Sequence, residues 1–466
     1  MREHSMTGIA QPAPQRIRRG RRRAAQASAA PSARVRRQRE LARRLGFMLA
    51  VLPAMAQAAD ARAQDDDFSS RTLTGDWNGE REALRRRGIG VYGDYVSETF
   101  GVVHGGLRRG VRYAQQVRVG ADFDMGRLAG WSAGTFHLTV NNRAGRSVSE
   151  ELVGNRLPVQ ETYGGQYTRL AELSYDQDLL DRRLNLKLGF WSMGNDLGGV
   201  VLLTNFVSAA FCAHPVAMSG NSGWYNYPTA RWGVQLRYRL SPALTLRTGV
   251  FQVNPTSANR SRAFSLFARG TTGALLPLEL EYDSGGGSGP GHYTGHYKFG
   301  GYYETSDTAR RGRDGEVGGR HGFYLLADQV VYRERADSDR GLTLFGQVMG
   351  SDRNTAQISD WYALGGLYKG IFPGRDNDTV ALGYVRAVIN RRLTQAAPAN
   401  GPGYAQEGPL TGLPNAEGMI ELNYGYWVKR WLHVRPAVQY VIDPGTYRRA
   451  RTPNALIAGV QVKLQF

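Results

Sequence analysis

The chain has 466 residues, of which 41% are hydrophobic and 21% are charged, and its mean hydropathy is −0.42. No run reaches the roughly 18 to 20 apolar residues of a spanning helix, so the composition excludes a helical membrane protein. The net charge is +19, but residues 1–46 supply +11 of it through 13 arginines set against two glutamates. Only +8 remains for the rest of the chain, so we expect no nucleic-acid partner.

Residues 1–58 have the layout of a basic extension followed by a secretory signal peptide. An arginine-rich stretch precedes a short apolar run from Phe47 to about Ala56, and Ala56-Gln57-Ala58 supplies small residues in A-x-A spacing. We expect cleavage after Ala58, with Ala56 as the alternative, and export of the mature chain. Residues 1–34 are compatible with either an over-extended start or a basic tail.

Residues 59–88 are predicted to form a periplasmic lead with one short helix. In "LTGDWNGEREALRRRGI", Asn78 can cap a helix over residues 79–87, and Gly88 can end it. Acidic residues stand near the start of this segment and arginines near its end, which suits the helix dipole.

Residues 89–466 alternate in polarity with a period of two, which predicts strands throughout. In "GTFHLTV", for example, Phe136, Leu138 and Val140 oppose His137 and Thr139. Sixteen segments of about ten residues follow this pattern. They are 89–103, 113–125, 133–143, 167–178, 184–193, 230–240, 244–253, 273–283, 294–305, 321–333, 341–350, 360–371, 379–391, 418–428, 431–441 and 455–466.

The connections between these segments alternate between short and long, which is the layout of a transmembrane β-barrel. Short connections include "SPA" and "KR", and long ones are 144–166, 194–229, 254–272, 306–320 and 392–417. The segment 284–293 breaks the pattern on the short side. Sixteen is an even number, so both ends of the barrel should emerge on one side, and so many strands should enclose water. The fold class is therefore all-β, a transmembrane antiparallel barrel of about 16 strands with a short N-terminal periplasmic helix.

The polar face of the strands carries many ionisable groups. Keeping them dry would cost several kcal/mol each, so we expect the polar face to line a water-filled lumen and the apolar face to meet lipid. The charged positions are Asp94, Glu98, Arg118, Glu172, Lys187, Arg237, Arg247 and Lys463.

The sequence contains no catalytic or metal-binding motif of the kinds that have a fixed spacing. Its one cysteine, Cys212, cannot form an internal disulfide and is expected to be a small buried side chain. His292 and His296 lie in a glycine-rich stretch rather than on a helix, which disfavours a metal pair. We therefore expect no enzyme activity, no cofactor and no metal.

Several segments resemble the carbohydrate-selective porins, the glucose porin family of Gram-negative outer membranes. The similar segments are "LTGDWNGEREALRRRGI" with "GVYGDYVSETFGVVHGG", then "NLKLGFWSMGNDLGG", "LTNFVSAAFC" and "YPTARWGVQLRYRLSPALTLRTGVFQVNP". The resemblance covers about residues 68–466. It implies a sixteen-stranded outer-membrane barrel through which monosaccharides diffuse in preference to other solutes of similar size. Only the long arginine-rich leader departs from the family.

A pore that selects sugars needs paired donors and acceptors for hydroxyl groups, together with aromatic rings for C–H faces. The inward face offers Asp94, Glu98 and Glu172 as acceptors, Arg118, Lys187 and Arg237 as donors, and Trp191 as a stacking surface. Binding must stay weak for the solute to leave again. Residues 194–229 are the candidate for a loop that folds inward and narrows the pore.

Other channel classes remain open from the sequence. The +8 charge of the mature chain suits an anion-selective or general-diffusion porin, and long loops also suit a surface adhesin. A homotrimer is compatible with a porin, although no residues mark a trimer interface.

The terminal strand "IAGVQVKLQF" should close the barrel against the first strand. We expect Val460, Val462, Leu464 and Phe466 to face outer-membrane lipid, because they alternate with polar residues. In outer-membrane barrels generally, a terminal Phe is part of what the assembly machinery recognises, which gives Phe466 a second expected role.

Overall fold

The computed structural model describes residues 68–211, 213–285, 293–335, 337–395, 414–445 and 452–466. The predicted signal peptide (1–58), the start of the predicted lead (59–67) and Cys212 lie outside the described residues. The described residues belong to one compact unit, Gln64–Phe466. Among them, no helix combines the length and the apolarity that a membrane crossing requires.

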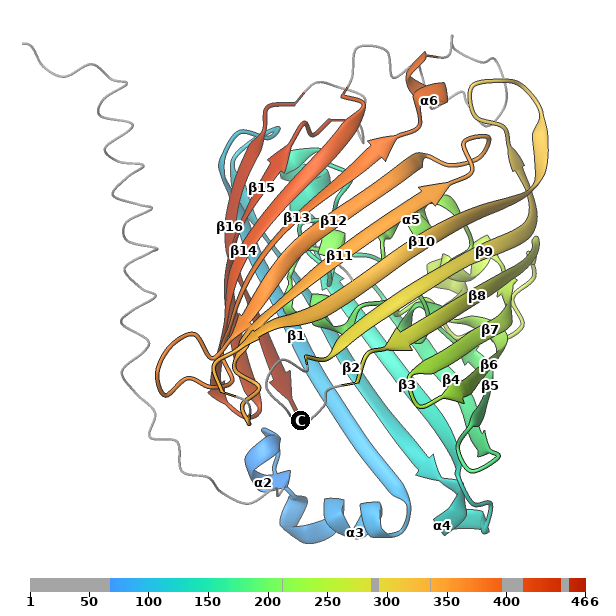
Figure 1. Ribbon diagram of the computed structural model, residues 1–466, viewed down its shortest axis with the longest axis vertical. Coiled ribbons are helices and arrows are strands. Elements are labelled where there is room, and N and C mark those ends of the chain that lie inside the picture. Colours follow the sequence, from blue (N-terminus) through green and yellow to red (C-terminus); the bar gives the residue numbers. More distant parts are fainter. Residues whose placement is uncertain (1–67, 212, 286–292, 336, 396–413, 446–451) are drawn as a thin grey trace, which may run out of the picture. The chain divides into compact units, whose positions relative to one another are not determined.

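Within the described residues, sixteen antiparallel strands close into one barrel, and β1 pairs with β16 (Figure 1). The predicted number and order of strands are confirmed, with most ends correct within a few residues. The strands are β1 (Ile89–His104), β2 (Gly110–Asp124), β3 (Gly134–Gly145), β4 (Thr168–Leu179), β5 (Leu184–Trp191), β6 (Arg231–Ser241), β7 (Leu244–Val253), β8 (Gly273–Asp283), β9 (Gly295–Ala309), β10 (Glu316–Arg333), β11 (Gly341–Ser351), β12 (Ile358–Lys369), β13 (Thr379–Ile389), β14 (Ala416–Lys429), β15 (Leu432–Ile442) and β16 (Ala455–Gln465).

Strands β9 and β10 are longer than predicted. They continue to pair up to Glu316 and Ala309, so the connection expected over 306–320 spans only 310–315. The extra residues include Ser306, Asp307 and Thr308, which show no apolar alternation. A strand that projects beyond the lipid has no need of an apolar outer side, so the pattern that identifies membrane strands is absent there.

Short helices and helical turns fill the connections. Three of them, α2, η2 and α3, precede β1, and α4 joins β2 to β3. Their bounds are α2 (Phe68–Arg71), η2 (Trp77–Gly79), α3 (Glu80–Arg86), α4 (Met125–Ala129), η3 (Ser149–Val153), η4 (Met193–Asn195), η5 (Val201–Asn205), η6 (Ala209–Phe211), α5 (Val216–Asn221), η7 (Pro255–Ala258), η8 (Arg260–Arg262) and α6 (Arg391–Gln395).

Helix α3 confirms the predicted helix before β1 but not its predicted cap. The Asn78 side chain makes no capping hydrogen bond, and this residue is left-handed, with φ 58°. Instead, Oδ1 of Asp76 accepts the backbone N–H of Glu82 at 3.0 Å. The carboxylate of Asp76 therefore satisfies one of the free amides at the start of α3. Gly88 follows the helix with φ +95°, as predicted for its stop.

The same helix is attached to the seam between the first and last strands. The buried guanidinium of Arg81 donates to the backbone oxygen of Phe466 at 2.7 Å and to that of Val91 at 3.0 Å. The backbone N–H of Phe466 in turn donates to the oxygen of Gly93 at 2.9 Å. Phe466 is thus paired into the wall, which confirms that the last strand closes the barrel.

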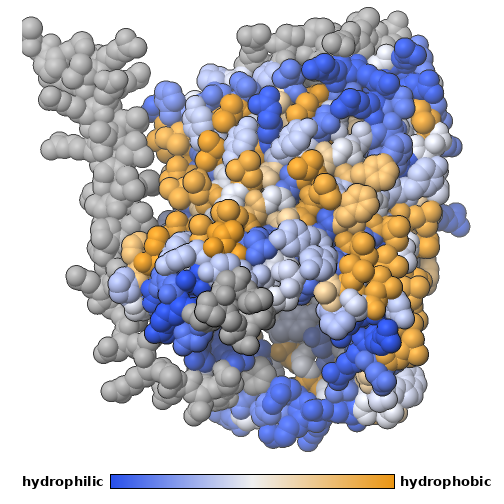
Figure 2. Space-filling view, in the orientation of Figure 1, coloured by the Kyte–Doolittle hydropathy of each residue, from blue (hydrophilic) through white to orange (hydrophobic). Residues whose placement is uncertain are grey.

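The outer wall is apolar around its middle and hydrophilic at both ends (Figure 2). On β10, for example, Phe323 and Leu325 are exposed on the outside, whereas their neighbours Tyr324 and Leu326 are buried inside. On β16, Gln461 is buried in the lumen wall, so Val460 and Val462 point outward. An apolar band between polar ends is the surface that a bilayer covers, and it confirms the predicted orientation of the two faces.

Candidate functional site

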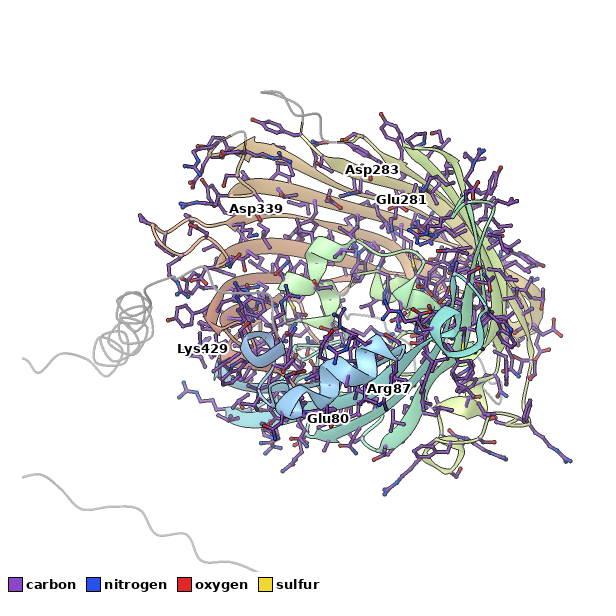
Figure 3. The ribbon with its side chains drawn as sticks, turned by 90° about the horizontal axis from the view of Figure 1, so that it is seen from below. Glu80, Arg87, Glu281, Asp283, Asp339 and Lys429 are labelled. Carbon is purple, nitrogen blue, oxygen red and sulfur yellow. The ribbon has the colours of Figure 1, made fainter. Side chains whose placement is uncertain are left out.

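Two connections at the end of the barrel opposite α3 turn back into its interior. We call residues 146–167 the first loop and residues 192–230 the second loop. Seen along the barrel, the green segment of the second loop lies inside the ring of strands (Figure 3). Its inward course agrees with the prediction made for 194–229, whereas the inward course of the first loop was not predicted.

The second loop packs against an apolar part of the inner wall. The Phe206 ring stacks on Phe211 with centroids 4.6 Å apart and meets Phe345 of β11 edge-on at 5.6 Å. Further along the loop, the Trp224 ring lies 6.1 Å from that of Tyr324 on β10. These side chains belong to one buried apolar cluster that joins the loop to β10–β13. Burial of this area holds the loop against the wall.

A glycine in β13 makes room for this contact. A Cβ atom at Gly383 would lie 2.7 Å from the Phe211 ring and 2.9 Å from the Phe206 ring, closer than side chains can approach. Gly365, which faces Gly383 across the β12–β13 pair, likewise leaves space for the Phe345 ring, since a Cβ there would lie 2.6 Å from it.

Five glutamates of the inner wall bind backbone or hydroxyl donors of the two loops, and each of them is 0% exposed. Carboxylates that accept N–H donors in a buried place make strong, charge-assisted hydrogen bonds. The first loop is bound by Glu98 and Glu417, and the second by Glu279, Glu304 and Glu421.

The inner wall of β1–β9 carries many charged side chains beside buried apolar residues such as Phe100, Trp191 and Phe251. Ion pairs join adjacent strands, except Asp178–Arg237, which spans from β4 to β6 across β5. Apart from Lys187, their side chains are partly exposed to the lumen, as the sequence predicted for a wet face. The pairs are Asp94–Arg118, Glu172–Lys187 (3.1 Å), Asp178–Arg237 (3.8 Å), Glu281–Arg247 and Glu281–Lys298 (3.6 Å).

Around Arg118 the wall gathers donors, acceptors and aromatic rings. The Arg118 guanidinium pairs with Asp94 and lies 5.7 Å from the Tyr92 ring centroid. Its partner on β3 is Asn141, whose Nδ2 donates to the hydroxyl of Tyr227 in the second loop at 3.0 Å. We call these five residues the Arg118 cluster. They bring together the groups that a sugar's hydroxyls and C–H faces require.

The predicted site residues fall into two groups. Asp94, Arg118, Glu172 and Arg237 lie on the lumen wall, and the two arginine side chains are 44% exposed. Glu98, Lys187 and Trp191 instead lie against the inward loops. They are described in turn below.

Glu98 is covered by the first loop, and its carboxylate accepts from the N–H of Thr162 at 3.1 Å and from Nε2 of Gln461 at 2.8 Å. Trp191 is fully buried, and its Nε1 donates to Asp196 of the second loop at 2.8 Å. Lys187 lies 3.3 Å from the same Asp196 carboxylate. In this structure the three residues contact protein rather than the open lumen.

Tyr92 and Asn141 were not among the predicted site residues, although strand alternation places both on the inward face with Asp94 and Arg118. Tyr227 had no such signal, because it lies in a loop. Among the described residues, no three His, Cys, Asp or Glu side chains gather as a metal-binding group.

His214 of the second loop has a pKa well below its ordinary value. It is buried, and burial lowers the pKa of its imidazole to about 4, because the charged form is poorly solvated. At neutral pH it is therefore an uncharged part of the packed loop.

The comparisons agree with this geometry. A family model described as "Carbohydrate-selective porin, OprB family" matches residues 108–466. Porin B of Pseudomonas aeruginosa is 31% identical over 457 residues, covering 92% of this chain and 98% of the relative. The putative porin QuiX of Acinetobacter baylyi is 28% identical over 443 residues, covering 90% and 99%.

Two solved structures of Pseudomonas putida OprB are also similar. The high-pH structure shares 29% identity and superposes with a TM-score of 0.78, and the low-pH structure shares 26% with a TM-score of 0.56. Each match covers 86% of this chain and 100% of the solved chain.

Proposed function

The chain belongs to the OprB family of carbohydrate-selective porins and is an outer-membrane carbohydrate channel, and we propose that monosaccharides are the solutes it passes best. The Arg118 cluster carries this proposal. It combines an ion pair with tyrosine rings on a lumen wall that two inward loops narrow. Such a surface can exchange hydrogen bonds with a polyol while staying weak enough to release it.

The residues proposed to contact the solute differ from those expected from the sequence. Asp94 and Arg118 remain in the set, and Tyr92 and Tyr227 are added to it. Glu172 and Arg237 line the lumen wall beyond this cluster. Glu98, Lys187 and Trp191 are proposed to act through the loops that they hold, since their polar groups are already bonded to protein.

Planar-bilayer recording tests the solute class. A series of monosaccharides and disaccharides is added to reconstituted channels, and the ion current and its noise are measured. We expect weak, saturable block by monosaccharides and little entry of disaccharides. Equal rates of liposome swelling for both classes would contradict a monosaccharide preference.

An anion-selective or general-diffusion channel is the second candidate. One observation favours it: Arg118 and Arg237 are more exposed to the lumen than the acids they pair with. The reversal potential in a salt gradient separates the two functions. Strong anion selectivity without sugar block would replace the carbohydrate proposal, whereas weak ion selectivity with sugar block supports it.

We also propose that the assembly machinery recognises β16 through Phe466. The residue lies at the β1–β16 seam and is held there by Gly93 and Arg81. Deleting Phe466 should lower the amount of protein in the outer membrane. An Arg81→Gln variant, which keeps Phe466, serves as the control for loss of the seam contact alone. Normal outer-membrane levels after the deletion would exclude the assembly role.

A further inference from the structure

Strand β14 carries two of the buried glutamates, and each binds a different loop. Oε1 of Glu417 accepts the backbone N–H groups of Arg156 and Leu157 in the first loop, at 2.8 and 2.7 Å. Glu421, one inward position beyond Met419 on the same strand, accepts those of Val207 and Ser208 in the second loop, both at 2.8 Å. One strand therefore holds both loops.

The two loops are also bonded to each other beside this pair of glutamates. The carbonyl of Pro158 in the first loop accepts from the hydroxyl of Ser208 at 2.7 Å and from the N–H of Ala209 at 3.0 Å. Nε2 of Gln439 on β15 donates both to Glu421 at 3.0 Å and to the carbonyl of Val159 at 3.1 Å. A displacement of either loop would break bonds to the other.

A carboxylate is the group that such a pair of consecutive amides requires. Both of its oxygens are acceptors, and its charge strengthens each bond. In Glu421 each oxygen accepts one amide, so a glutamine there would turn its NH₂ group toward one of the two N–H groups. In Glu417, Oε1 accepts both amides and Oε2 lies 3.0 Å from the N–H of Arg156, so the NH₂ group of a glutamine would face that N–H and the charge would be lost. Water cannot take over the lost bond, because both glutamates are fully buried.

We propose that Glu417 and Glu421 are positioning residues that lock the two inward loops into one unit and thereby set the width of the pore. Glu98, Glu279 and Glu304 hold single loops at other points of the wall. The β14 pair, together with Gln439, acts on both loops at their mutual contact. The proposal concerns the aperture and does not depend on which solute passes.

Single-channel recording in potassium chloride tests this proposal without any sugar. We expect Glu417→Gln and Glu421→Gln to visit a wider, higher-conductance substate about ten times as often as the unaltered channel, since one lost charged hydrogen bond is worth about that factor or more. If the loops are one unit, opening it breaks both anchors, so both substitutions should populate the same substate and their effects should multiply in the double variant. The retained mobility shift of heated against unheated protein on a gel shows that the barrel is folded.

Glu281→Gln is the matched control. Glu281 is another inward carboxylate, but it pairs with Arg247 and Lys298 of the wall and receives no loop amide. It should change conductance through its charge without adding the wider substate. If Glu417→Gln and Glu421→Gln behave like this control, or if each opens a substate of different conductance and the double variant shows only the sum of the two, the proposal is overturned.

A milder variant covers the case in which the glutamine variants insert too poorly for recording. Gln439→Ala keeps both carboxylates and removes the link between Glu421 and Val159. We expect it to populate the same wider substate several times more often than the unaltered channel. A folded Gln439→Ala channel with unaltered substates would refute the coupling of the two loops.

Discussion

The inner wall of this barrel has two unlike parts. From β1 to β9 it carries ion pairs such as Asp94–Arg118, whose side chains reach the lumen, beside apolar residues such as Phe100 and Phe251 that are buried. From β10 to β13 it is lined by apolar residues such as Phe345 and Trp361, which are buried beneath the second loop. The difference shows how a large barrel narrows itself: charge marks the wall that water wets, and apolar side chains mark the wall that a loop covers.

The physical reason is that each kind of wall would cost free energy in the surroundings of the other. A charged wall under a dry loop would lose several kcal/mol for each unpaired ion, and an apolar wall facing water would forgo the gain from burial. The five buried glutamates are the exception, since each carboxylate accepts hydrogen bonds from backbone N–H groups of the loop that covers it.

Phe206→Ala should have the largest effect, because it should release the second loop from the inner wall. Phe206 fills the contact between the loop and β11, and removing a buried phenylalanine costs about 3–5 kcal/mol. We expect faster proteolysis within 192–230 and larger conductance. Phe323→Ala, on the lipid side of β10, is the control, because it removes the same ring without touching a loop. Equal proteolysis of the two variants would mean that the apolar wall does not hold the loop.

Lowering the pH should loosen the same loop through His214. The buried imidazole has its pKa lowered to about 4, below its value near 6.5 when exposed, so the displaced loop binds protons more readily. Docking should be at full strength above pH 6.5 and weaken as the pH falls toward 4, by up to roughly 3 kcal/mol. The rate of loop proteolysis against pH measures this. His214→Phe should remove its contribution, and an unchanged pH profile in that variant would assign the effect to other groups.

Gly383→Ala should displace Phe206 and Phe211 from the wall. The added methyl would lie within 2.9 Å of both rings, an overlap that costs about 1–3 kcal/mol. Gly346→Ala on β11 is a matched control, since nothing lies within 4 Å of its Cβ position. We expect wider substates in single-channel traces for the first variant only. If neither variant shows wider substates, the rings can move without opening the pore.

Arg118→Ala addresses the charged wall. It should weaken monosaccharide block about tenfold while leaving loop proteolysis unchanged, because one charged donor is lost from the lumen and none from the loops. Arg237→Ala removes an equally exposed arginine nearer the α3 end and should weaken block less. If the two variants weaken block to the same degree, solute recognition is not concentrated at the Arg118 cluster.

The sequence predicts the strands of the barrel wall better than the loops that fold inside the barrel. Alternation identifies all sixteen strands and correctly places Asp94 and Arg118 on the inner face. The same alternation places Glu98 inward too, yet cannot show that the first loop covers it. That contact joins Glu98 to Thr162, and the anchor of the same loop on β14 joins Leu157 to Glu417, 260 residues away. Neither position carries a local pattern.

Apolar residues on the inward face of β11 and β12 are the sequence signal for a loop that covers this part of the wall. In "FGQVMG" and "DWYALGG", the apolar inward positions are Phe345, Met349, Trp361 and Ala363, which alternation alone assigns to neither lipid nor water. Strands that are apolar on both faces indicate that something inside the barrel covers them. In this chain that cover is the second loop, whose Phe206 and Phe211 rings pack against β11 and β13.

The division of the lumen into a wet and a covered wall is tested most directly by thiol labelling. Arg118→Cys and Val385→Cys are made in a Cys212→Ser background and treated with a charged, water-soluble thiol reagent. Both positions face inward, on β2 and β13, but only Val385 lies under the second loop's apolar cluster. We predict fast labelling at position 118, slowed by added monosaccharide, and protection at position 385. Equal labelling rates at the two positions would contradict the division.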